Sequence, residues 1–91
     1  MAVRVKIPTQ LRAATGGVSE ASVEGATVAE VLDGLFAQFG ELRERLQDEQ
    51  GGLRRFVNVY LAGEDIRFLD GVNTLVPPGA ELTILPAVAG G

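Results

Sequence analysis

One apolar stripe near the middle of the chain limits the possible folds more than any other feature. The stripe consists of Val28, Val31, Leu32, Leu35, Phe36 and Phe39. These positions follow the 3.6-residue period of an α-helix that buries one face. Thr27 just before the stripe and Glu30 three residues later match a capping box, which predicts that the helix begins at Val28. We expect Gly40 to be its C-cap.

Two strands are expected before this helix. Residues 3–7 alternate aliphatic side chains with one arginine and one lysine, as in a strand with one buried face, and Pro8 ends the segment. A turn at residues 15–17 contains two glycines, and residues 18–23 follow it with strand character. We therefore expect the two segments to pair in antiparallel fashion.

Three more strands are expected after the helix. Residues 56–61 are almost wholly apolar and β-prone, and a turn at residues 63–65 predicts a hairpin with residues 66–68. Residues 81–85 have the alternation of a strand and follow a proline-rich turn. We expect that turn to cover Leu75.

The predicted order is strand, strand, helix, strand, strand, strand, with a short surface helix around Leu42 and Leu46. A helix with one apolar face covers one face of a sheet, so the fold class is α+β, with a mixed sheet of about four to five strands packed on one main helix. The predicted order fits the β-grasp arrangement of ubiquitin-like proteins. We assign residues 1–86 to this domain and residues 87–91 to a flexible C-terminal tail.

Charge and composition exclude several classes of function. The net charge of −4 repels phosphate backbones and anionic bilayers, so neither nucleic acid nor a membrane is expected as a partner. The absence of His and Cys removes the usual pairs of nucleophile and base and the common zinc ligand sets. We expect no enzyme activity and no bound metal or cofactor. Without a signal peptide or membrane span, we expect a cytoplasmic protein.

The ending LPAVAGG is the most unusual segment. Pro86 cannot donate to a sheet ladder, so residues 87–91 are expected to project as a tail of up to about 17 Å. Glycine at the last two positions removes every Cβ near the terminal carboxylate, which lets the backbone enter a narrow active site. We predict that the Gly91 carboxylate is the working group and that four residues thread it into partner enzymes: Ala87, Val88, Ala89 and Gly90. An ordinary frayed end is the alternative.

Four segments resemble the ubiquitin-like sulfur carriers, a family that includes the small subunit of molybdopterin synthase and the thiamine-biosynthesis carrier. They are VKIPT at residues 5–9, TGG at 15–17, RFVNVY at 55–60 and ILPAVAGG at 84–91. The last segment is the most specific. The chain is most similar to the actinobacterial carriers of cysteine biosynthesis.

The resemblance implies that an E1-like adenylyltransferase and sulfurtransferase, using ATP with Mg, converts the Gly91 carboxylate to a thiocarboxylate. It implies delivery of sulfur to a cysteine synthase dependent on pyridoxal phosphate (PLP) or to a sulfur-insertion enzyme of secondary metabolism, with a metalloprotease releasing cysteine. ATP and PLP belong to those partners. The acceptor stays open, and two alternatives remain: a small subunit of molybdopterin synthase and a ubiquitin-like protein modifier.

A partner-docking surface is predicted on the strand at residues 56–61. Alternate aliphatic residues of this strand are assigned to the helix side. Phe56 and Tyr60 then lie on the open face of the sheet, with Arg55 beside them, and exposed aromatic side chains are typical anchors for a partner. Packing of both aromatic residues into the core or under a loop is an equal alternative.

Overall fold

The computed structural model describes residues 2–47, 53–54 and 57–86. Along the chain the helices and strands are β1 (Ala2–Lys6), the 3-10 helix η1 (Thr9–Thr15), β2 (Glu20–Glu24), α1 (Val28–Gln38), α2 (Gly40–Leu46), β3 (Val57–Leu61), β4 (Glu64–Asp65), the 3-10 helices η2 (Ile66–Phe68) and η3 (Gly71–Asn73), and β5 (Glu81–Pro86). Among the described residues, no helix is long and apolar enough to cross a membrane.

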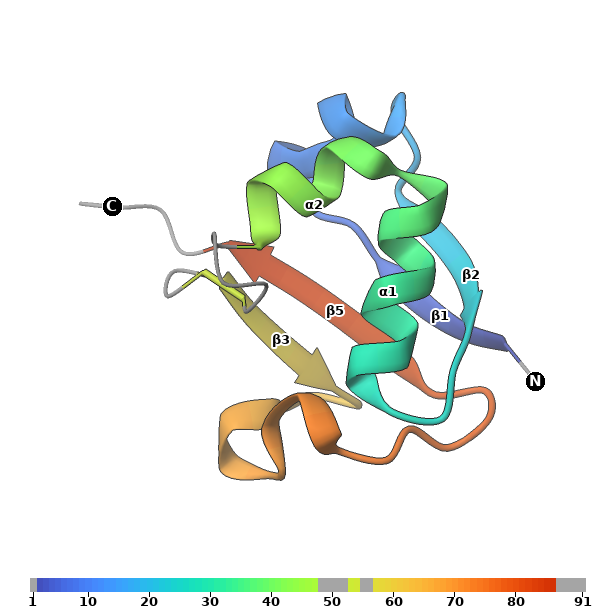
Figure 1. Cartoon of the computed structure of the whole chain (residues 1–91), viewed down its shortest axis with the longest axis vertical. Helices are drawn as coiled ribbons and strands as arrows, with labels where there is room; N and C mark the ends of the chain where they lie inside the picture. The colour runs from blue at the N-terminus through green and yellow to red at the C-terminus, as the bar shows by residue number, and fades with distance from the viewer. Residues whose placement is uncertain (1, 48–52, 55–56, 87–91) are drawn as a thin grey trace.

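The strands form one mixed sheet in the order β2-β1-β5-β3-β4. β1 and β5 are parallel, and the other neighbouring pairs are antiparallel. Helix α1 lies across one face of this sheet (Figure 1). The arrangement confirms the predicted α+β, β-grasp fold and places β5, the strand that leads to the tail, at the centre of the sheet.

The core lies between the sheet and α1. Each long strand buries alternate side chains, as the period of two requires: β1 buries Val3 and Val5, and β5 buries Leu82 and Ile84. The same alternation buries the three aliphatic residues of β3, as predicted: Val57, Val59 and Leu61. The α1 stripe supplies the other side of the core, with Phe39 packed against it and only partly buried.

The start of α1 agrees with the capping-box prediction. The Glu30 N–H donates to Thr27 Oγ1 over 3.2 Å, and the Glu30 carboxylate accepts from the Ala26 N–H over 3.1 Å. The helix begins at Val28 as expected. The Thr27 hydroxyl therefore satisfies an amide that the first helical turn leaves without a partner, and the Glu30 carboxylate satisfies the amide of Ala26, just before the cap.

The predicted end of α1 is wrong, because Gly40 is the first residue of α2 and Phe39 is the residue between the two helices. The cause is packing: Leu42 and Leu46 are 0% and 1% exposed, so α2 turns inward directly after α1. The expected surface helix therefore belongs partly to the core.

The predicted hairpin after β3 is also corrected. Its second strand is only the two-residue β4, and residues 66–68 form η2. The Asp65 carboxylate accepts the Arg67 N–H over 2.9 Å, and this local bond favours a turn over a continued strand. Leu75 is 74% exposed, so the expectation that the proline-rich turn before β5 covers this side chain is wrong. Other differences are the 3-10 helices η1 and η3, which were not predicted, and a β2 that begins at Glu20.

Candidate functional site

The candidate site begins where β5 ends. β1 flanks this strand on one side and β3 on the other, with the pairing to β3 continuing to Pro86. Leu82 and Ile84 are 0% and 1% exposed and fix the strand against the core. The last described residue, Pro86, is thus anchored five residues before Gly91.

Most of the predicted site residues lie outside the described part of the chain. These are the five tail residues Ala87, Val88, Ala89, Gly90 and Gly91, and two residues of the predicted docking surface, Arg55 and Phe56. Tyr60 is described. It is half-buried on β3, alternates with the buried aliphatic residues and stands opposite Thr83 of β5. Tyr60 is therefore on the open face of the sheet, as predicted, and the docking surface stays a prediction.

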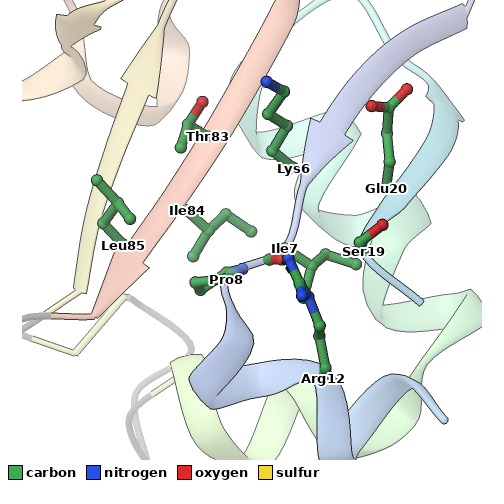
Figure 2. A pocket seen from close by; sticks show the side chains of 9 residues that line it. All are labelled: Lys6, Ile7, Pro8, Arg12, Ser19, Glu20, Thr83, Ile84 and Leu85. Atoms are coloured by element: carbon green, nitrogen blue, oxygen red, sulfur yellow. Dashed lines mark hydrogen bonds between the residues drawn. The ribbon is translucent and has the colours of Figure 1, made fainter. Parts of the chain in front are cut away.

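An open depression of about 360 Å³ lies beside the end of β5. Figure 2 shows Lys6, Arg12 and Leu85 around it, contributed by β1, η1 and β5. The Arg12 Nε–H donates to the Ile7 carbonyl over 3.3 Å, which holds this half-buried side chain over the end of β1. Leu85 is 44% exposed. The depression thus combines two cations and the Glu20 carboxylate with an exposed apolar side chain, close to the end of β5.

This cluster was missed by the sequence analysis, which used the strand residues only to predict the sheet. Pro8 is a weak sequence signal for the depression. β1 ends just before this proline, whereas β5 continues for three residues beyond the pair formed by Lys6 and Thr83. The two strands therefore separate near their ends.

An ion-pair cluster continues from the depression along the open face. The Glu81 Oε2 atom lies 3.7 Å from Lys6 Nζ and 3.9 Å from Arg4 Nη2. All three side chains are partly solvent-exposed, so each pair contributes little to stability. Their effect is local: Glu81 positions the two cations of β1.

The described residues contain no group of three or more His, Cys, Asp or Glu side chains that could hold a metal ion.

The carboxyl group with the clearest shift in pKa lies away from the end of β5. At Asp65, the hydrogen bond from the Arg67 backbone N–H lowers the pKa, the Arg67 guanidinium lowers it further, and desolvation opposes them. Asp65 therefore supports the turn after β4.

Comparison with known proteins agrees with this geometry. The sequence model of the ThiS family matches residues 5–91. The sulfur carrier protein CysO of Mycobacterium tuberculosis is 47% identical over 93 aligned positions that span both chains completely.

Two further relatives are similar over much of the chain. In the crystal structure of the Amycolatopsis orientalis BexX/CysO complex, the matching chain superposes with a TM-score of 0.90 at 48% identity, covering 99% of this chain and 100% of that one. Small archaeal modifier protein 3 of Haloferax volcanii is 38% identical over 68 positions, which are 75% of this chain and 73% of that protein. The chain therefore belongs to the ThiS family of ubiquitin-like sulfur carriers and is a co-substrate rather than a catalyst.

Proposed function

We propose that this chain carries sulfur as a thiocarboxylate on Gly91, with residues 1–86 as the domain that partners grip and residues 87–91 as the tail that enters their active sites. The observation that carries the proposal is the position of β5. This central strand is held on both sides and ends five residues before Gly91. The match to CysO spans both proteins completely, and the ThiS match extends to Gly91, which supports a role for the last residues.

The chemistry requires activation, because a carboxylate is a poor acyl donor. A Gly91 carboxylate oxygen attacks the α-phosphorus of ATP, pyrophosphate leaves, and an acyl-adenylate forms. Hydrosulfide then attacks the carbonyl carbon and gives up its proton. The carbon–oxygen bond to AMP breaks, and AMP leaves with the electron pair. When a sulfurtransferase persulfide attacks instead, the product is an acyl disulfide, and a thiol must then form a disulfide with the sulfurtransferase sulfur to release the thiocarboxylate. The thiocarboxylate that remains carries sulfur on an unhindered terminal glycine.

The length of the tail limits where a partner can bind. Five residues span at most about 17 Å, so an active site that holds Gly91 must lie within that distance of Pro86. A partner enzyme therefore contacts the surface around the end of β5. We assign this contact to the open face of the sheet, with Tyr60 and Leu85 as apolar contacts and with Phe56 and Arg55 as further candidates.

The resemblance to the sulfur carriers implies the partners that we propose. An E1-like adenylyltransferase supplies the site for ATP and Mg, and a sulfur-accepting enzyme consumes the thiocarboxylate. That acceptor is a PLP-dependent cysteine synthase, with a metalloprotease releasing the product, or a sulfur-insertion enzyme of secondary metabolism. The complex of CysO with BexX supports the formation of direct complexes in this family.

The test uses the intact mass of the protein. The chain is incubated with an E1-like adenylyltransferase, ATP, Mg and a sulfur source, and the expected mass increase equals the difference between one sulfur and one oxygen. A variant lacking Gly91 is the matched control. No increase, with an enzyme that sulfurates another ThiS-family carrier in parallel, would reject the proposal.

A second candidate function is protein modification, favoured by the similarity to small archaeal modifier protein 3. In that case the activated Gly91 is joined to lysines of other proteins. Antibody detection in lysate would then show a ladder of conjugates that disappears when Gly91 is deleted. A single band at the size of the free chain would support the carrier function alone.

A further inference from the structure

Lys6 is the only lysine of the chain, since the other seven cationic side chains are arginines. An arginine guanidinium stays protonated in proteins and is a poor acyl acceptor. A lysine amine is a good nucleophile once it has lost a proton. The chain therefore offers one side-chain amine to any activated acyl group, including its own.

The fold places this amine near the base of the tail. Lys6 is the last residue of β1 and is in register with Thr83 of the parallel strand β5. Pro86 lies three residues beyond Thr83 along β5, and β1 is one strand spacing to the side. These two distances together place the Lys6 Cα atom about 11 Å from the Pro86 Cα atom. The five tail residues span up to about 17 Å, so Gly91 has enough chain to fold back to Lys6.

The Glu81 ion pair controls where the ammonium lies. Glu81 precedes Thr83 by two residues, on the side away from Pro86, and its Oε2 atom is 3.7 Å from Lys6 Nζ. Figure 2 accordingly shows the Lys6 side chain pointing away from Pro8 and Arg12. The pair thus draws the ammonium away from the end of the strand where the tail leaves. The Lys6 side chain is 52% exposed and free to adopt other rotamers when the pair opens.

We propose that Lys6 is an intramolecular acylation site for adenylated Gly91 and that Glu81 restrains this reaction. The inference rests on the proposed function, because the acyl-adenylate is the acyl donor. The ammonium first releases a proton to solvent, and its nitrogen then bonds to the Gly91 carbonyl carbon. The carbon–oxygen bond to AMP breaks, AMP leaves with the electron pair, and the nitrogen loses a second proton. The product is an internal amide that carries no sulfur, so Glu81 favours sulfuration over self-capture.

The experiment omits the sulfur source so that the acyl-adenylate accumulates. The chain is incubated with ATP, Mg and an E1-like adenylyltransferase that activates a ThiS-family carrier, and peptide mapping locates any new amide. We expect monomer with a mass reduced by one water and a Lys6–Gly91 crosslink, absent from Lys6→Arg. Glu81→Gln should form the crosslink about two- to five-fold faster, as expected for loss of an exposed ion pair. Glu24→Gln makes the same charge change on β2, opposite Ala2, and should leave the rate unchanged.

Hydroxylamine in a parallel reaction traps the acyl-adenylate as a hydroxamate and separates the two proposals. Hydroxamate without any Lys6 crosslink, in both the wild type and Glu81→Gln, would overturn this inference and leave the carrier function standing. Absence of hydroxamate would overturn both. A crosslink at another amine or between two chains would reject Lys6 as the internal site, and equal rates for wild type and Glu81→Gln would reject the role of Glu81.

Discussion

Gly34 marks a close approach of α1 to the sheet, and replacing it with alanine tests how tightly the two pack. An ideal Cβ at this position would lie 2.6 Å from Val23 Cγ1 on β2, closer than two carbon atoms can approach without movement. Val23 is 3% exposed and packs within the core, so its displacement disturbs other side chains.

The two effects of Gly34→Ala have opposite signs. Alanine favours the helix over glycine by about 1 kcal/mol in a helix interior. Inserting a methyl group into a well-packed core costs about 1–3 kcal/mol. We therefore expect a net loss of between about 0 and 2 kcal/mol in the free energy of unfolding.

Gly40→Ala is the matched control. Gly40 is the exposed first residue of α2, its φ is not positive, and an added Cβ would have no atom within 4 Å. This variant should gain up to about 1 kcal/mol. Had Gly40 been the left-handed C-cap that its place in the sequence suggests, alanine would instead be destabilising.

Urea denaturation of both variants, together with Val23→Ala and the double variant Val23→Ala/Gly34→Ala, measures the contact directly. Removing Cγ1 makes room for the new methyl group, so the double variant should be more stable than the sum of the single losses predicts, by about 1 kcal/mol or more. The reasoning is refuted if Gly34→Ala is as stabilising as Gly40→Ala, or if the two positions prove additive.

Three further predictions concern the tail, the helix cap and the turn after β4. Adding one residue after Gly91 should abolish sulfuration, measured by intact mass, while thermal unfolding stays unchanged; a thiocarboxylate on the extended chain would contradict the site. Thr27→Ala should lower the free energy of unfolding by about 1 kcal/mol in urea, whereas Thr27→Ser, which keeps the acceptor oxygen, should lose much less. Asp65 has a lowered folded-state pKa, so its contribution is present above about pH 4 and is lost as the pH falls through the folded-state value. Asp65→Asn should therefore be less destabilising at pH 3 than at pH 7, and an equal loss at both would contradict the assignment.

Helix α1 is predictable from sequence because two independent signals coincide. The apolar spacing fixes its buried face, and the Thr27 and Glu30 pair fixes its first residue. Its end is less predictable because a glycine after a helix is only a local preference. The burial of Leu42 and Leu46 depends on η1, which packs against α2 from another part of the sequence.

The segment after β3 is an example in which the sequence pattern predicts the wrong element. Ile66 and Phe68 have strand propensity, but the Asp65 carboxylate binds the backbone two residues ahead and bends the chain into η2. Ile66 is buried while Phe68 is 87% exposed, an outcome that the hydrophobicity of the two side chains does not distinguish. Here one side-chain hydrogen bond outweighs the general preference for a strand.

One part of the candidate site, the tail, is predictable from the sequence, whereas the other part, the depression beside β5, is not. The tail is a sequence signal, because small residues that follow a strand-ending proline are recognisable without a fold. The depression beside it depends on register: Lys6 is near Leu85 only because β1 is parallel to β5, and Arg12 is near both only because η1 follows Pro8. No spacing in the sequence brings these three residues together.

The placement of the tail on β5, rather than on β2 or β4, has a physical consequence for sulfur transfer. β2 and β4 lie at the edges of the sheet and pair on one side only, whereas β5 pairs on both sides and buries Leu82 and Ile84. A partner that draws Gly91 into its active site therefore pulls on a strand held by two ladders and the core. The open face around Tyr60 and Leu85 therefore keeps a fixed position relative to Pro86, from which the proposed partners would reach Gly91. The same rigidity holds Glu81, which is in register with Arg4, 3.7 Å from the Lys6 ammonium on the adjacent strand, so this exposed ion pair restrains the proposed self-capture.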